Sequence, residues 1–233
     1  MLRSHFPRTD FYHNVLTLLS GTVIAQAIPI LLSPVLSRIY SPEEFGVFSM
    51  FSAIASAVAV IATFRYELAI MLPEKETTAI NILRLSFIIT TALSGSLLLI
   101  ILVFHQQVPV WLATSELRSF QYYLPFFLLF AGGAQALNYW ISRQKKFRLL
   151  ATGKVGQTST TGLISIALGC LNFSSAGLII GALAGQFASF LIYAAGSVKK
   201  IVSLESFVSR KKMLENFHTY KTFMVVNTPH ALL

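Results

Sequence analysis

Three ionisable side chains, Arg65, Glu67 and Arg84, lie inside long apolar stretches of this sequence. A charge inside a membrane-spanning helix is costly, so such residues often serve ion or substrate pathways, or pair with one another. Arg65 and Arg84 are predicted to lie at similar depth, where two guanidinium groups could hold a phosphate or pyrophosphate bidentately. The structural alternative is that both side chains snorkel to the lipid headgroups.

Glu67 has two interpretations, and the sequence leaves both open. As the only acidic residue within a predicted span, it is a candidate for coupling to a proton or sodium ion. The alternative, which we favour, is a structural ion pair with Arg84. Arg65 is a poor partner within the helix, because two residues of α-helix turn by roughly 200°.

Amide and hydroxyl side chains form further polar patches. In the first apolar stretch, small and polar residues recur every three or four positions, with Gln26 beside them. Asn138 forms a similar patch with Gln135 and Ser142. Such groups either join helices together or line a cavity that recognises sugars. The histidines and the single cysteine show no metal-ligand spacing, and we predict neither a metal nor a cofactor.

Six apolar stretches must position these residues, and each approaches or exceeds the roughly 20 residues that cross a bilayer core. Helices satisfy their own backbone hydrogen bonds in lipid, so we predict an all-α, polytopic transmembrane bundle of six spanning helices. Two prolines, Pro29 and Pro34, predict a kink or an unwound stretch in the first. The stretches are Val15–Ser37, Val47–Leu72, Ala79–Phe104, Phe120–Ile141, Val155–Asn172 and Ala176–Val198.

Composition and charge agree with this class. Of 233 residues, 55% are hydrophobic and only 12% are charged, about half the charged share of a soluble domain. With the N-terminus in the cytoplasm, fourteen of the eighteen basic residues lie inside, and only Arg38 and Arg118 lie outside. This bias predicts a cytoplasmic N-terminus and a basic cytoplasmic loop over 143–154. It also explains the net charge of +9 without nucleic acid, and some basic residues are expected to touch membrane lipids.

The chain divides by composition into four parts. The last is apolar but too short to span, which predicts the truncated start of a seventh helix; an interfacial segment is the alternative. We therefore expect a truncated product or a fragment. The parts are a polar cytoplasmic lead at 1–14, the six-helix region at 15–198, a basic linker at 199–221, and the cut segment at 222–233.

Three strings in the first third, Leu19–Gln26, Ser37–Gly46 and Arg65–Ile70, resemble the N-terminal half of Wzx-type O-antigen flippases. These belong to the polysaccharide-transport branch of the multidrug/oligosaccharidyl-lipid/polysaccharide (MOP) exporter superfamily. The resemblance implies one six-helix lobe of a two-lobe transporter. It implies flipping of undecaprenyl-pyrophosphate-linked oligosaccharide across the bacterial inner membrane for lipopolysaccharide biosynthesis. A polysaccharide polymerase and a chain-length regulator are the implied partners.

On this interpretation the candidate substrate-binding residues are Arg65, Arg84, Gln26 and Asn138, and the candidate ion-coupling residue is Glu67. A drug or ion-coupled small-solute exporter of the same superfamily is the first alternative, and an inactive membrane fragment is the second. Metal-dependent glycosyl transfer usually requires clustered carboxylates that bind the metal ion. The single aspartate, Asp10, and the lack of a DxD pair therefore argue against an enzyme.

Overall fold

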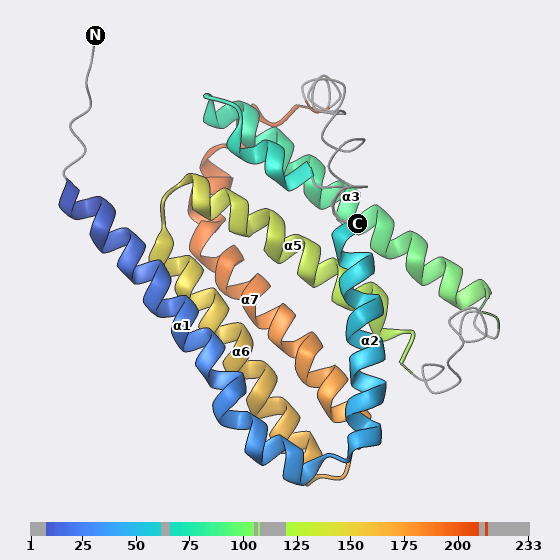
Figure 1. The fold of residues 1–233 in the computed structure, drawn as a ribbon. Helices are drawn as coiled ribbons and strands as arrows, with labels where there is room; N and C mark the ends of the chain where they lie inside the picture. Colours follow the sequence, from blue (N-terminus) through green and yellow to red (C-terminus); the bar gives the residue numbers. More distant parts are fainter. Residues whose placement is uncertain (1–7, 62–65, 105–106, 108–119, 210–212, 214–233) are drawn as a thin grey trace.

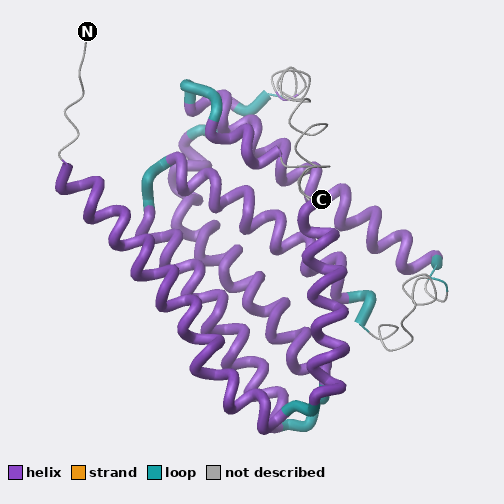
Figure 2. The backbone as a smooth tube through the Cα atoms, in the orientation of Figure 1, coloured by secondary structure: helices purple, strands orange, loops and turns teal. Residues whose placement is uncertain are grey.

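The computed structural model describes residues 8–61, 66–104, 107, 120–209 and 213, and nearly all of these residues are helical (Figures 1 and 2). The predicted all-α, polytopic bundle is therefore confirmed. The long helices are α1 Arg8–Ile39, α2 Pro42–Ile61, α3 Glu76–Val103, α5 Tyr123–Arg143, α6 Phe147–Cys170 and α7 Ser175–Ser203. Two short 3₁₀ helices are η1 Tyr66–Met71 and η3 Glu205–Phe207.

The helices pack both with their sequence neighbours and with distant ones. Helix α6 lies between α1 and α7, α5 packs along α7, and α3 packs on the outer side of α5 (Figure 1). Helix α2 leaves the end of α1 at a tight corner and rests on α5 and α7, so that α1 and α2 diverge from that corner (Figure 1). The opposite end of the bundle holds the α5–α6 connection, and we call it the α5–α6 end.

Five of the helices described here are long and apolar enough to cross a membrane: α1, α2, α3, α5 and α7. The chain is thus built as a multi-pass membrane protein. The prediction of six spans included Val155–Asn172, which corresponds to α6. Although α6 has 24 residues, it is not among those five, because it carries a lysine, a glutamine and a run of serine and threonine residues. Its polar side chains are accommodated between two neighbouring helices.

Helix boundaries differ from the predicted ones at the charged ends. Helix α1 begins at Arg8, inside the predicted polar lead, and α7 continues through the basic residues Lys199 and Lys200. Helix α6 begins at Phe147, so the predicted loop over 143–154 is wrong, and only 144–146 connect α5 to α6. Basic side chains do not end a helix; their long stems let it continue past the apolar stretch.

Two predictions concern the continuity of the helices. Helix α1 is continuous through Pro29 and Pro34, so no stretch of it is unwound. The two prolines remove two backbone N–H donors. An unwound stretch in lipid would leave further backbone groups without hydrogen bonds, so it would cost more than the two missing donors. Of the predicted span Val47–Leu72, the described residues form α2 up to Ile61 and the 3₁₀ helix η1 from Tyr66 to Met71. Residues 62–65, and the predicted seventh segment at 222–233, lie outside the described residues.

Helix η1 is held by a buried core between α3 and α5. Arg143, at the end of α5, donates hydrogen bonds to the backbone carbonyls of Ile70 and Glu74, each at 3.1 Å. These bonds satisfy carbonyls that the short 3₁₀ helix leaves open. The largest buried side chains of this core are Tyr66, Ile70, Ile80, Ile82, Leu83 and Trp140.

Three glycines of α7, in a row of spacing four, allow α6 to approach closely. A Cβ atom built on Gly181 would lie 2.2 Å from Ser165 Oγ and 2.9 Å from the Thr161 carbonyl oxygen. One built on Gly185 would lie 2.0 Å from Thr161 Oγ1. Gly177 faces Tyr40. This small-residue row therefore serves packing inside the bundle, as small-xxx-small rows commonly do.

The corner between α1 and α2 is fastened to the α6–α7 end. The hydroxyl of Tyr40 donates to the backbone carbonyl of Ser165 at 2.6 Å. Ser41 and Glu44 form a reciprocal capping box at the start of α2, and Glu44 also accepts a hydrogen bond from the Ser174 hydroxyl. Burial, with the Glu44 carboxylate nearby, raises the pKa of Tyr40, which keeps its hydroxyl protonated and donating.

The segment after α7 is fastened to α3. Asn81 is completely buried; its side-chain amide donates to the Phe207 carbonyl at 3.1 Å, and its oxygen accepts from the Ser209 backbone at 2.9 Å. Beside it, Arg84 forms an ion pair with Glu205. These contacts fix residues 205–209 against the first half of α3.

Candidate functional site

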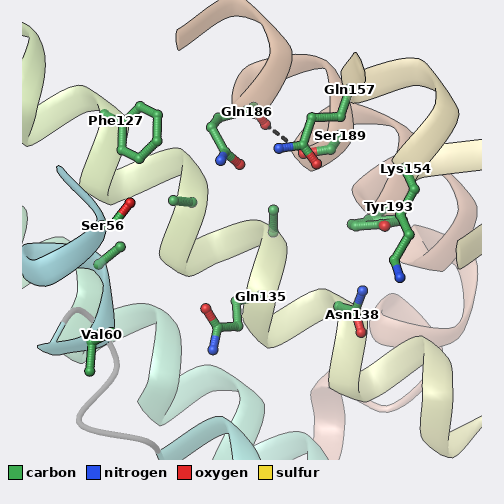
Figure 3. A pocket seen from close by; sticks show the side chains of 13 residues that line it. Ser56, Val60, Phe127, Gln135, Asn138, Lys154, Gln157, Gln186, Ser189 and Tyr193 are labelled. Carbon is green, nitrogen blue, oxygen red and sulfur yellow. Dashed lines mark hydrogen bonds between the residues drawn. The ribbon is translucent and has the colours of Figure 1, made fainter. Parts of the chain in front are cut away.

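A polar cavity of about 440 Å³ lies between α2, α5, α6 and α7 (Figure 3). Amide, hydroxyl and ammonium groups from α5, α6 and α7 reach it, while α2 contributes mostly small side chains. A cavity with polar side chains between apolar helices is a place where hydrogen-bonding groups of a ligand can replace their water partners. The lining residues are Ser56, Ala59, Val60, Phe127, Ala131, Ala134, Gln135, Asn138, Lys154, Gln157, Gln186, Ser189 and Tyr193.

Lys154 is the one charged side chain among the described residues that line this cavity. It lies in the second turn of α6, seven residues after Phe147, or roughly 10 Å from the start of the helix. Figure 3 shows its ammonium group near Asn138 and Tyr193. It has no ion-pair partner within the described residues. An ammonium group that is partly removed from water and not neutralised favours an anionic ligand.

Four side-chain amides line the same cavity. Gln135 and Asn138 lie one turn apart on α5, Gln157 comes from α6, and Gln186 comes from α7 (Figure 3). Each amide carries two donors and one acceptor oxygen. Together they can bind a ligand that is rich in hydroxyl groups.

Two hydroxyl groups shape the wall on α7. Ser189 donates to the Gln186 backbone carbonyl at 2.9 Å, the bond drawn in Figure 3. Tyr193 donates to the Leu150 carbonyl at 3.3 Å. The tyrosine ring is buried, so packing sets its position at the cavity wall.

Glu67 lies directly behind this cavity. Its side chain is completely buried in η1, and its Oε1 accepts a hydrogen bond from Gln135 Nε2 at 2.8 Å. Gln135 therefore stands between the carboxyl group and the cavity. The predicted ion pair between Glu67 and Arg84 is wrong, because Arg84 pairs with Glu205 instead. Glu67 lies instead in the 3₁₀ helix η1, which packs on α5.

The sequence-predicted substrate-binding residues are not all brought together. Asn138 lines the cavity. Arg84 lies on α3 in a separate apolar groove beside the segment after α7. Gln26 is exposed on α1, whose Gly21 and Ala25 are the residues that turn inward. Arg65 lies outside the described residues, so its role stays a prediction.

Sequence reasoning missed Lys154, Ser56, Gln186, Ser189 and Tyr193. The charge of Lys154 predicts a cytoplasmic loop, because basic residues usually flank spans. The signal that indicates otherwise is spacing: Lys154, Gln157 and Thr161 follow one another at three and four residues, which places them on one helical face. Within the described ranges, no group of three histidine, cysteine or acidic side chains can hold a metal ion.

Comparison with known proteins agrees with a role in the assembly of complex carbohydrates. The family model described as polysaccharide biosynthesis protein matches residues 11–230, nearly the whole chain. No curated protein and no solved structure gives a significant match.

Proposed function

Because this chain belongs to the polysaccharide biosynthesis protein family, we propose that it flips a lipid-linked oligosaccharide across the bacterial inner membrane. The proposed substrate is an undecaprenyl-pyrophosphate-linked repeat unit of O-antigen or a related surface polysaccharide. The observation that carries this proposal is the polar cavity with Lys154 among four side-chain amides. The cation suits the pyrophosphate, and the amides suit the sugars.

The physical task explains why a cavity is needed. Sugar hydroxyls and a pyrophosphate lose their water partners in a hydrocarbon core about 30 Å thick, and each unpaired polar group there costs several kcal/mol. A polar cavity within the bundle supplies replacement partners. The polyprenyl tail needs no such help and stays in the lipid, which is as apolar as the tail itself.

Charge distribution supports access from the cytoplasm. Lys154 lies near the α5–α6 end, which also carries Arg143, Lys146 and Lys200. Basic residues accumulate on the cytoplasmic side of membrane proteins, so this end is proposed to be cytoplasmic. Precursors assembled in the cytoplasmic leaflet would then meet the cavity from the leaflet in which they are made.

Deletion of the gene tests the proposal against an enzymatic role. We expect surface polysaccharide to disappear while complete lipid-linked repeat units accumulate and stay inaccessible to a glycosidase added to intact spheroplasts. Incomplete repeat units would instead indicate a glycosyltransferase. Repeat units that are accessible from outside but not joined together would indicate a polymerase. Either of these two results would contradict flipping.

Ion coupling at Glu67 is a second part of the proposal, supported by its hydrogen bond to the cavity residue Gln135. Protonation of the carboxyl group changes it from acceptor only to donor and acceptor, which changes how Gln135 is held. Glu67→Gln is neutral at every pH. We expect this variant to lose stimulation of transport by a proton gradient, measured in proteoliposomes with and without a gradient.

Glu74→Gln is the matched control, because Glu74 is exposed in the turn after η1. It should keep the wild-type response. Full stimulation of the Glu67→Gln variant would show that this carboxyl group is structural. A gradient-driven efflux of small cationic drugs, with no flipping, would favour the alternative of a drug exporter.

A further inference from the structure

An apolar groove of about 530 Å³ runs along the outer face of α3, separate from the polar cavity. One wall is a stripe of α3 side chains, and the other comes from the segment that follows α7. Helix α3 lies at the outside of the bundle and packs on it through α5 and η1, so the groove faces the lipid when α3 spans the membrane (Figure 1). The lining residues are Arg84, Phe87, Ile88, Thr91, Ala92, Val208 and Met213.

The groove has a charged end and an apolar length. Arg84 lies eight residues after Glu76, the first residue of α3, or roughly 12 Å along the helix. The other groove residues of α3 follow at spacings of three and four, on the same face, as far as Ala92, roughly 12 Å deeper. A phospholipid has the same order, with its phosphate in the interfacial region and its acyl chains in the hydrocarbon core.

The charged end is a pair of opposite charges. Arg84 Nη2 holds Glu205 Oε1 in an ion pair, and the two side chains are 41% and 55% exposed. The other guanidinium nitrogens and Glu205 Oε2 make no further hydrogen bond within the part of the chain that the structure describes. A phosphoethanolamine headgroup carries the complementary charges. Its phosphate accepts hydrogen bonds from a guanidinium group, and its primary ammonium group has three donors for a carboxylate.

The wall beside α3 is held in place before any ligand binds. The completely buried Asn81 hydrogen-bonds to the backbone of Phe207 and Ser209, one residue on each side of the groove residue Val208. Glu205 belongs to the same short segment. Because this segment is already ordered, a ligand in the groove does not bear the entropic cost of ordering it.

We propose that the groove binds one molecule of phosphatidylethanolamine, with its phosphate at Arg84, its ammonium group at Glu205 and an acyl chain along Ile88 and Ala92. Phosphatidylcholine has the same phosphate and chains, but its quaternary nitrogen has no N–H donor for the carboxylate. Phosphatidylglycerol has no cationic group, and it would place a net negative headgroup beside Glu205. The inference does not depend on which substrate the protein transports.

The preference is tested by native mass spectrometry of the purified protein in detergent, with the dioleoyl forms of these three lipids added separately. Because the chains are identical, only the headgroups differ. We expect one phosphatidylethanolamine to bind roughly tenfold more tightly than phosphatidylcholine, the effect of one charged hydrogen bond. Equal binding of these two lipids, or tightest binding of phosphatidylglycerol, would overturn the inference.

A charge variant tests the headgroup site. Glu205→Gln removes the partner of the ammonium group, so phosphatidylethanolamine should then bind no better than phosphatidylcholine. Glu76→Gln is the matched control, because Glu76 forms the other ion pair at this end of α3, with Lys200, and neither residue lines the groove. It should keep the tenfold preference. Equal loss of the preference in both variants would mean that the headgroup is not recognised at Glu205.

A bulk variant tests the apolar part of the groove. Ile88→Trp enlarges a side chain in the groove and should weaken binding of phosphatidylethanolamine, whereas Leu99→Trp makes a similar change at an exposed position of α3 outside the groove and should not. Both positions are exposed, so neither substitution disturbs the packed interior. Phosphatidylethanolamine binding that survives both Glu205→Gln and Ile88→Trp would place the lipid elsewhere and overturn the inference.

Discussion

Replacement of Lys154 by glutamate is expected to abolish transport of lipid-linked oligosaccharide, by at least about a hundredfold. A charged hydrogen bond contributes roughly 1.5–3 kcal/mol, and the new carboxylate adds repulsion toward the pyrophosphate. Two effects of this size together correspond to two or more powers of ten in binding. The measurement is flipping in proteoliposomes, with pyrophosphate binding determined on the same protein.

Two further variants make the result specific to the cavity. Lys154→Arg keeps the charge and should retain most of the activity, whereas Lys199→Glu reverses a charge that is exposed near the end of α7 and should have little effect. If Lys154→Glu flips its substrate at the wild-type rate in a stable protein, the cation has no part in recognition. Equal losses in Lys154→Glu and Lys199→Glu would indicate a general effect of surface charge.

Substitution of Gly181 by valine is expected to cost about 1–3 kcal/mol of stability, the range for overpacking a well-packed interior. The added Cβ would meet Ser165 Oγ at 2.2 Å and backbone atoms of α6 at 2.9 and 3.1 Å. Backbone cannot rotate away as a flexible side chain can, so the two helices must move apart. Thermal unfolding in detergent measures the change, and the midpoint should fall clearly.

Gly95→Val is the matched control, because a Cβ at Gly95, within α3, has nothing within 4 Å. Like Gly181→Val, this variant replaces a helical glycine with a β-branched residue. Its unfolding midpoint should stay near the wild-type value. A Gly181→Val protein as stable as Gly95→Val would mean that α6 and α7 are not packed along this row.

The class of fold follows directly from the sequence, because long apolar stretches have one stable arrangement in lipid. The corner at Ser41 and Pro42 can also be predicted from the sequence, since a capping serine, a proline and two glutamates are typical of the start of a helix. The glycine row of α7 indicates close packing before any partner is known. Each of these signals is local, and each acts through the backbone of its own helix.

The details of the site depend on tertiary contacts that no local pattern contains. Glu67 was assigned to a continuous span, but the chain forms a short 3₁₀ helix there and turns the carboxyl group toward Gln135. Arg84 meets Glu205, which lies 121 residues further along the chain. The charge of Lys154 predicts a loop residue, because basic residues usually flank spans, whereas its spacing from Gln157 and Thr161 predicts a shared helix face.

The hydrogen-bonded corner at Tyr40 holds one end of α2, and this end lies far from the polar cavity. Its 20 residues extend about 30 Å, so each degree of tilt about the corner moves the opposite end by about 0.5 Å. The cavity-lining residues of α2 lie toward its opposite end; they are Ser56, Ala59 and Val60. A tilt of α2 by three or four degrees about the corner would therefore change the width of the cavity by about 1–2 Å.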